Sequence, residues 1–311
     1  MATGPTIAAV TEVRAARPNA SATLLATLSD YWALTKPEVN FLILITTFAG
    51  FYLATVSVSA RFNSLLALDT LLGTLLVAGG TATLNQVLEC RFDRRMRRTA
   101  RRPVASGRIE TSHALIFGLA LAAVGSAELA YAVNQLACFL ALVTLVVYLL
   151  VYTPVKRVSP LCTLVGAFPG AMPPLIGWAA VSGRIALEAW ILYAIVFLWQ
   201  FPHFMAIAWM YREDYARAGY LVLPLNERRD RYVVLQSLIA SLGLAVVTLL
   251  PAIYGKSGFS YLVGALMLGG IFIYYSSELA LQRSNTSARR LLVASILYLP
   301  AVFLLMMLDV K

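Results

Sequence analysis

The sequence has 311 residues, of which 60% are hydrophobic and only 13% are charged. Soluble domains carry roughly one-quarter charged residues, so this composition excludes a soluble fold and indicates a polytopic membrane protein. The net charge is +10, but the cations lie in short segments between apolar runs, as in the cytoplasmic loops of membrane proteins, and we expect no nucleic-acid partner.

Apolar runs of about 18 residues or more predict an all-α bundle of about nine transmembrane helices. Residues 1–30 precede them, are rich in Ala and Thr, and lack the basic start and continuous apolar core of a secretory signal. We expect a disordered cytoplasmic tail over 1–30 and one membrane domain over 31–311. The predicted spans are, to within several residues, about 40–58, 66–89, 112–132, 135–154, 160–181, 188–211, 232–254, 258–281 and 291–308.

The distribution of Lys and Arg predicts the orientation. Most of these residues fall near the N-terminus and in the loops that follow the second, fourth, sixth and eighth spans, and only four lie on the other side: Arg61, Arg184, Lys256 and Lys311. Because positive loops face the cytoplasm, we expect the N-terminus and the arginine-rich loops in the cytoplasm and the C-terminus outside.

The second span ends in an acidic face. Asn85, Glu89 and Asp93 are spaced i, i+4, i+8, which places them on one side of a helix. Their oxygens are the hard ligands that Mg2+ takes together with water and phosphate oxygens. The alternative is a solvated helix end whose carboxylates pair with the arginines that follow, which are Arg91, Arg94, Arg95, Arg97, Arg98, Arg101 and Arg102.

The sixth span ends in a second acidic pair, Glu213 and Asp214, on the same predicted side of the membrane. The two acidic ends can therefore meet across a bundle. If the sixth span continues that far, Asp214 shares a helical stripe with His203, and this stripe leads from the cytoplasmic end into the membrane. The alternative is an ordinary loop in which Arg212 and Arg217 balance the acids.

Three further polar residues have two readings each. Lys156 and Arg157 follow Pro154, which ends or kinks the fourth span, and are either positive-inside residues or cations for a diphosphate. His203 lies inside an apolar span and is either a hydrogen-bonded filler of a helix kink or a ligand or acid–base group for a substrate in the bilayer. With His113 and His203 as the only histidines, and no metal-ligand spacing among the cysteines, any metal must be held mainly by oxygen.

Four stretches carry a family resemblance. The pattern N-x-x-x-E-x-x-x-D with its following R-x-M-x-R-T-x-x-R-P resembles the first metal motif of the intramembrane aromatic prenyltransferases of the UbiA superfamily. Within it, the match is closest to the branch of the protoheme IX farnesyltransferases, or heme O synthases. The stretches are Asp30 to Thr46, Asn85 to Pro103, Tyr152 to Gly183 and Trp199 to Pro224.

This resemblance implies a nine-helix bundle in the cell inner membrane, around a chamber open to lipid. It implies Mg2+ as cofactor, farnesyl diphosphate and heme B as substrates, and heme A synthase as a possible partner. Farnesyl transfer to a heme vinyl group, with addition of water, would give heme O and diphosphate. By motif position, the implied metal ligands are Asn85, Glu89, Asp93, Glu213 and Asp214, and the implied diphosphate ligands are Lys156, Arg157, Arg98 and Arg102.

Other readings stay open. The chain departs from the superfamily pattern at Glu89, where aspartate is usual, and at Tyr211 and Tyr215, where quinone-type relatives tend to have aspartates, so the number of metal ions is open. His203 could orient the water or ligate the heme iron. A prenyltransferase with another aromatic acceptor is the nearest alternative. A secondary transporter is less favoured, because its polar groups would lie near the midplane rather than at the cytoplasmic ends.

Overall fold

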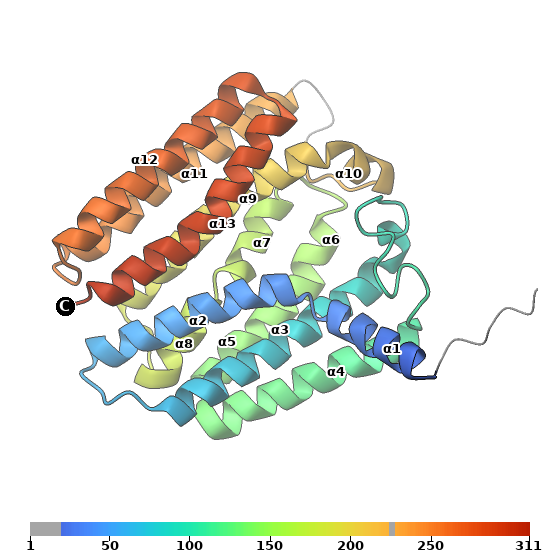
Figure 1. Cartoon of the computed structure of the whole chain (residues 1–311), viewed down its shortest axis with the longest axis horizontal. Coiled ribbons are helices and arrows are strands. Elements are labelled where there is room, and N and C mark those ends of the chain that lie inside the picture. Colours follow the sequence, from blue (N-terminus) through green and yellow to red (C-terminus); the bar gives the residue numbers. More distant parts are fainter. Residues whose placement is uncertain (1–19, 224–227) are drawn as a thin grey trace, which may run out of the picture.

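The computed structural model describes residues 20–223 and 228–311, which form helices joined by short connections except for the longer loop over residues 94–110 between α3 and α4 (Figure 1). Within these ranges, nine helical segments are long and apolar enough to cross a membrane, which confirms the predicted all-α bundle. The spans are α2 (Pro37–Ser57), α3 (Ser64–Asp93), α4 (Thr111–Glu128) with η1 (Leu129–Val133), α5 (Gln135–Val146) with η2 (Val147–Tyr152) and α6 (Thr153–Val155), α7 (Cys162–Gly170) with α8 (Pro173–Ser182), α9 (Leu187–Met210), α11 (Arg228–Ile253), α12 (Phe259–Gln282) and α13 (Asn285–Leu308).

The segment expected to be a disordered tail is helical where it is described. Helix α1 (Ala20–Leu34) covers its last residues, while residues 1–19 lie outside the described part of the chain. Its alanines and leucines favour a helix, and tertiary contacts hold its end in place. Asp30 pairs with Arg108 at 3.0 Å, and the Gln86 side chain donates a hydrogen bond to the Leu34 carbonyl. The sequence of 1–30 alone did not indicate this helix, because the contacts that hold its end come from distant segments.

The last span starts earlier than predicted, at Asn285 rather than near residue 291. Ser284 is its N-cap and forms a reciprocal capping box with Ser287. Such a cap stabilises the first turn of a helix. The arginines at 289 and 290 therefore lie on the first turns of a helix, not in a loop.

Close helix packing builds the first half of the bundle. Helix α3 packs along α4, and α2 packs on α8. A Cβ atom at Gly80 would lie 2.7 Å from the Gly118 carbonyl oxygen, and one at Gly125 would lie 2.7 Å from that of Gly73. These glycines let the backbones of α3 and α4 approach, as small residues do in membrane helix pairs. In the second half, α9 packs between α11 and α13.

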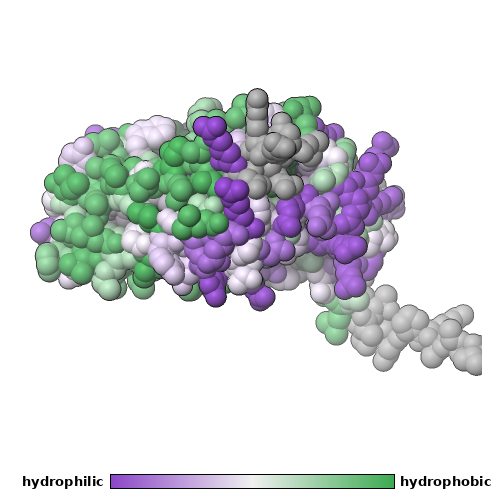
Figure 2. Space-filling view, turned by 90° about the horizontal axis from the view of Figure 1, so that it is seen from above, coloured by the Kyte–Doolittle hydropathy of each residue, from purple (hydrophilic) through white to green (hydrophobic). Residues whose placement is uncertain are grey.

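Helix α3 is longer than a bilayer core requires. Its 30 residues give a length of about 45 Å, against a hydrocarbon thickness of about 30 Å. Its last turns, which bear Asn85, Glu89 and Asp93, therefore extend to the membrane boundary. Figure 2 shows hydrophilic residues gathered at this end of the molecule and apolar ones over the other.

The Gly- and Pro-rich fifth span is broken, as its composition predicts. Helix α7 ends at Gly170, and α8 begins at Pro173. The Gln200 side chain of α9 donates a hydrogen bond to the Ala167 carbonyl at 3.1 Å. Irregular backbone at membrane depth is tolerated where protein groups cover it, and this contact provides such cover.

Candidate active site

The two acidic segments meet at one end of the bundle. The Arg98 backbone N–H donates a hydrogen bond to Asp214 Oδ2 at 3.3 Å, and the Arg98 guanidinium lies 3.4 Å from the Tyr215 hydroxyl. A small apolar cluster underlies this contact and joins Met96 to Tyr220, with Phe92 packed against it. The end of α3 is thereby fixed against α10 (Arg212–Ala218).

Three buried carboxylates line this end, and each is paired with a cation. Glu89, Asp93 and Asp214 are 4%, 2% and 7% exposed. Removing charges from water is costly, so a group of buried ion pairs is a weak source of stability. Such groups point instead to a functional charge arrangement. The pairs are Glu89 with Lys156 at 3.0 Å, Asp93 with Arg102 at 2.8 Å and Asp214 with Arg217 at 2.8 Å.

Lys36 completes the first acidic face. Its ammonium donates a hydrogen bond to Asn85 Oδ1 at 3.2 Å, and the Asn85 amide donates to Thr153 Oγ1 at 3.2 Å. Burial, helped by the nearby Arg102 guanidinium, lowers the pKa of Lys36 to about 7. Lys36 has φ 52°, a left-handed conformation that is uncommon for a residue other than glycine. Backbone strain of this kind is frequent at functional sites.

In sequence, Lys36 is one of the cations near the N-terminus that favour a cytoplasmic location. Two features of the sequence could have indicated a role for Lys36. It directly precedes Pro37, where the first span starts, and it lies in the stretch Asp30 to Thr46 that resembles the family. Its partner lies 49 positions away, so no local pattern could name it.

Lys156 reaches the site from the end of the fourth span. That span ends in a π-helical segment, η2, and the single turn α6, and π-helical turns often mark functional positions. The Lys156 ammonium lies 4.3 Å from the centre of the Tyr152 ring and 3.0 Å from Glu89. Burial alone would lower the pKa of Lys156, but the Glu89 carboxylate and the Tyr152 hydroxyl hold it well above its usual value.

Arg157 differs from its neighbours because no carboxylate is paired with it among the described residues. Its guanidinium lies 4.1 Å from the centre of the Phe92 ring, and its Nε is buried without a hydrogen-bond partner in the part of the chain that the structure describes. An unsatisfied buried donor is rare in a folded protein. The site therefore offers a cationic donor to an anion.

The second acidic pair is split. Asp214 is buried, whereas its neighbour Glu213 is exposed. Successive residues of a helix point about 100° apart, so α10 can turn only one of the two toward the site. The structure brings Asp214, but not Glu213, to the first acidic motif.

The donor set suits a metal that is shared with a phosphate ligand. Among the described residues, no three His, Cys, Asp or Glu side chains converge as a closed metal cage. Mg2+ does not require one, because it is commonly held by one or two carboxylates plus phosphate oxygens and waters. The oxygens of Asn85, Glu89, Asp93 and Asp214 fit that mode of binding.

His203 has a fixed ring and a defined tautomer. Its Nδ1 lies 2.8 Å from Ser295 Oγ, and that hydroxyl donates its proton to the Leu292 carbonyl at 2.6 Å. In the tautomer that satisfies both contacts, Nδ1 is the donor to Ser295 Oγ and Nε2 keeps a lone pair. The Trp199 ring stacks on the imidazole at 4.7 Å between centroids.

His203 lies on a partly buried face of α9. In the half of α9 nearest α10, His203, Ile207 and Met210 are all partly buried and share this face. Helix α9 ends at Met210, and Asp214 lies in the separate helix α10, so the expected stripe is not continuous as far as Asp214. The remaining histidine, His113, is exposed at the start of α4.

Comparison with known proteins agrees with this architecture. A model of the UbiA prenyltransferase family matches residues 43–304. The chain is 47% identical to a protoheme IX farnesyltransferase of Solibacter usitatus (strain Ellin6076), over 91% of this chain and 99% of that protein.

Solved structures share the fold. A structure of digeranylgeranylglyceryl phosphate synthase aligns over 91% of this chain and 98% of its own, with a TM-score of 0.72 and 18% identity. A UbiA homolog from Archaeoglobus fulgidus, bound to GPP and Mg2+, aligns over 89% and 99%, with a TM-score of 0.60 and 17% identity. The chain belongs to the UbiA prenyltransferase family.

Proposed function

We propose that the protein transfers the farnesyl group of farnesyl diphosphate to a vinyl group of heme B, with addition of water, to give heme O and diphosphate. The observation that carries the proposal is the meeting of two acidic segments and their cations at the membrane boundary of an apolar bundle. A prenyl diphosphate needs both a charged site and an apolar one. The name of the 47% identical relative supports heme as the acceptor.

Mg2+ would be held by Asn85, Glu89, Asp93 and Asp214, and it would neutralise charge on the diphosphate as the carbon–oxygen bond breaks. The Archaeoglobus fulgidus homolog, which binds GPP and Mg2+, supports this cofactor. Glu213 is left out of the ligand set because its side chain is exposed.

The cations at the site would bind the diphosphate. Lys156 and Arg102 are paired with Glu89 and Asp93. If these carboxylates held Mg2+, Lys156 and Arg102 would be available to bind phosphate oxygens. Arg157 already has a free donor, and Arg98 lies beside Asp214. Substrate binding would thus replace the ion pairs of Lys156 and Arg102 within the protein by ion pairs with the diphosphate.

The reaction breaks the allylic carbon–oxygen bond, and its electron pair leaves with the diphosphate. The cations stabilise that developing negative charge. The π electrons of the heme vinyl group then form the new carbon–carbon bond to the farnesyl cation. Water adds to the resulting porphyrin-side cation and loses a proton. An apolar chamber would protect the first cation from early capture.

His203 would ligate the heme iron through Nε2. Metal-bound histidines usually donate their other ring N–H to a fixed partner, which orients the ring, and Ser295 is such a partner here. We expect His203→Ala to lose the imidazole-ligated spectrum of bound ferric heme and added imidazole to restore it. If the spectrum is unchanged in the variant, His203 is not the ligand.

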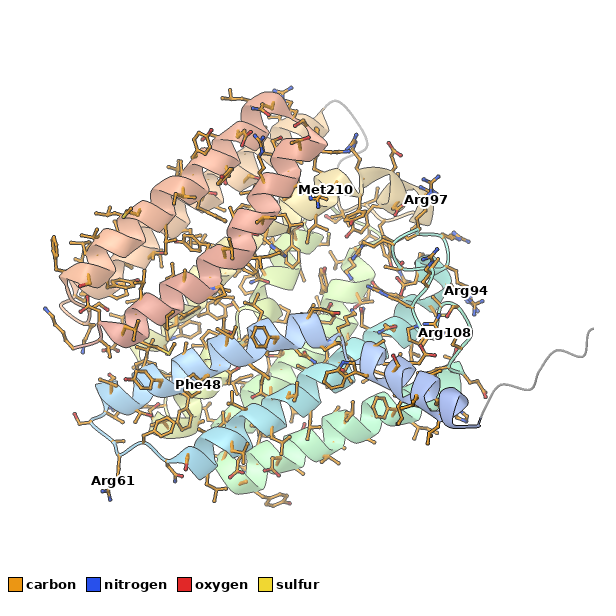
Figure 3. The ribbon with its side chains drawn as sticks, in the orientation of Figure 1. Phe48, Arg61, Arg94, Arg97, Arg108 and Met210 are labelled. Carbon is orange, nitrogen blue, oxygen red and sulfur yellow. The ribbon has the colours of Figure 1, made fainter. Side chains whose placement is uncertain are left out.

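The acidic end would face the cytoplasm in the cell inner membrane, with the N-terminus on that side and the C-terminus outside. Arginines favour this orientation because they gather at one end: Figure 3 shows Arg94, Arg97 and Arg108 there, and Arg61 at the opposite end. The product would pass to the next enzyme of heme modification, for which heme A synthase is the expected partner.

One experiment tests the reaction. Hemes extracted from membranes that express the chain should show a mass gain of one farnesyl group plus one hydroxyl group. With purified protein and farnesyl diphosphate, we expect heme B to be consumed and 4-hydroxybenzoate to be left unchanged. Prenylation of 4-hydroxybenzoate would instead indicate another aromatic acceptor, and failure to release diphosphate with heme present would favour a transporter.

A further inference from the structure

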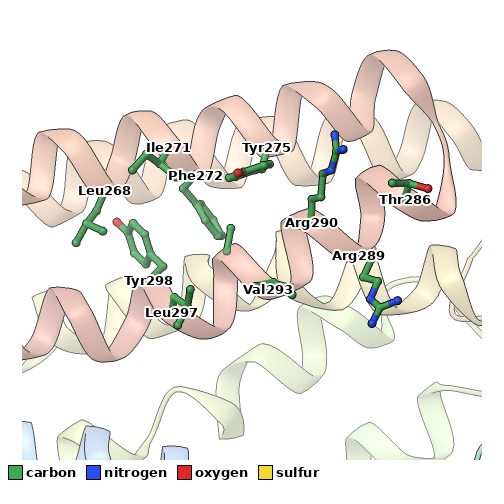
Figure 4. Close-up of a pocket in the computed structure, with 11 residues that line it drawn as sticks. Leu268, Ile271, Phe272, Tyr275, Thr286, Arg289, Arg290, Val293, Leu297 and Tyr298 are labelled. Carbon is green, nitrogen blue, oxygen red and sulfur yellow. The ribbon is translucent and has the colours of Figure 1, made fainter.

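A groove runs along the outer side of the bundle between α12 and α13 (Figure 4). Its volume is about 490 Å³. Phe272 and Tyr298 form a buried floor, with ring centroids 4.8 Å apart. Ile271, Val293 and Leu297 are about half exposed or more along its rims. The Tyr298 hydroxyl lies 3.0 Å from Thr248 Oγ1, so it is engaged within the bundle. The groove is therefore apolar for most of its length.

Its polar lining residues lie at one end. Thr286, Arg289 and Arg290 line the groove beside the turn between α12 and α13. Arg290 forms an ion pair with the buried Glu278, whereas Arg289 is exposed and has no ion-pair partner among the described residues. One positive charge is thus left uncompensated at that end.

The length of the groove matches one leaflet of a bilayer. Its α13 lining runs from Thr286 to Tyr298, a rise of about 18 Å, and one leaflet contributes about 15 Å of hydrocarbon. Arg212 of α10 donates a hydrogen bond to Asn285 Oδ1 at 2.8 Å. The charged end of the groove is therefore at the same membrane boundary as the acidic site.

We propose that this groove binds an anionic phospholipid of that leaflet, with its acyl chains over Phe272 and Tyr298 and its phosphate headgroup on Arg289 and Arg290. Guanidinium groups bind phosphate oxygens in a forked geometry, and basic pockets between membrane helices select anionic headgroups. A zwitterionic lipid matches the apolar groove but not the unpaired charge.

The site is separate from the acidic cluster and does not rest on the proposed function. It has a structural link to His203, however. Helix α13 also carries Ser295, whose hydroxyl holds the His203 ring. A lipid packed on α13 would steady the helix that positions this histidine.

Lipid retention by the purified full-length chain tests the proposal. The protein is placed in nanodiscs of phosphatidylcholine with or without phosphatidylglycerol, and retained lipids are counted by native mass spectrometry. Arg289→Gln removes the unpaired cation and leaves the Arg290 pair with Glu278 intact. We expect it to retain phosphatidylglycerol about fivefold more weakly, the effect of one arginine near a membrane surface. Arg61→Gln, which changes an exposed arginine at the opposite end, should behave as the unmodified chain.

A second variant tests the role of the apolar part of the groove. Val293→Trp fills the groove and keeps both arginines, and it should also lose the retained phosphatidylglycerol. Equal retention by Arg289→Gln and Arg61→Gln would overturn the proposal. So would equal retention of phosphatidylcholine, or a second copy of the chain crosslinked at residue 293 in place of lipid.

Discussion

The two acidic segments look alike in sequence but differ in how the fold uses them. In the first, Asn85, Glu89 and Asp93 are all buried. In the second, only Asp214 is buried, and its cation, Arg217, comes from the same short helix. Lys36, Lys156 and Arg102 serve the first segment from separate parts of the chain.

This difference indicates an unequal division of roles. The first segment is a site assembled by tertiary structure, in which every oxygen ligand faces a cation that a substrate could take over. The second adds one carboxylate and fixes the loop after α3 through the Arg98 backbone. Mutations that affect the two segments should therefore have unequal effects, and the predictions below follow from the largest to the smallest.

The largest expected loss is for Asp93→Asn. The change keeps the shape of the side chain but removes the charge of a proposed metal ligand, and loss of transition-state electrostatics of this kind costs about 10³-fold in turnover. The measurement is heme O formed per minute by purified protein at saturating Mg2+.

Glu213→Gln is the matched control in the second segment. Its carboxylate is exposed, so its activity should stay within about twofold of the unmodified chain, as for most surface substitutions. Comparable losses in the two variants would mean that the segments contribute equally, contrary to the structure.

Lys156→Gln should follow, with about 10²-fold lower kcat/KM for farnesyl diphosphate, because one preorganised cation is removed from the leaving group. Arg217 is the partner of Asp214, and its own side chain is 43% exposed. Arg217→Gln should therefore lower kcat/KM for farnesyl diphosphate much less. If Arg217→Gln has the larger effect, the diphosphate lies on the second segment instead.

The sequence was sufficient for features that depend on local pattern. The nine spans follow from apolar length, and the common face of Asn85, Glu89 and Asp93 follows from helical spacing. The sequence was insufficient where tertiary packing determines which side chain pairs with which. Nothing in the arginine run shows that Arg102, rather than Arg97 or Arg101, reaches Asp93. The exposure of Glu213 depends on how α10 is rotated against the loop after α3, which its own sequence does not encode.

Thr153→Val tests whether the first segment is held in position by its neighbours. Thr153 Oγ1 accepts a hydrogen bond from the Asn85 amide and donates one to the Tyr148 carbonyl. Without it, the Asn85 oxygen loses its orientation, and the Mg2+ concentration for half-maximal activity should rise about tenfold. Activity at saturating Mg2+ should largely recover, which separates a positioning role from misfolding. A variant with an unchanged Mg2+ requirement would remove Asn85 from the ligand set.

Ser295→Ala has the smallest expected effect, and it probes the hydrogen bond between Ser295 and the His203 ring. The substitution removes one hydrogen bond to His203 but leaves the imidazole and its Trp199 stack in place. One hydrogen bond contributes about 1 kcal/mol, so heme affinity should fall about fivefold. The imidazole-ligated spectrum should persist, because Nε2 can still bind iron once the ring returns to the same tautomer. Complete loss of that spectrum would mean that the hydrogen bond from Ser295 is required for His203 to ligate the heme, contrary to this expectation.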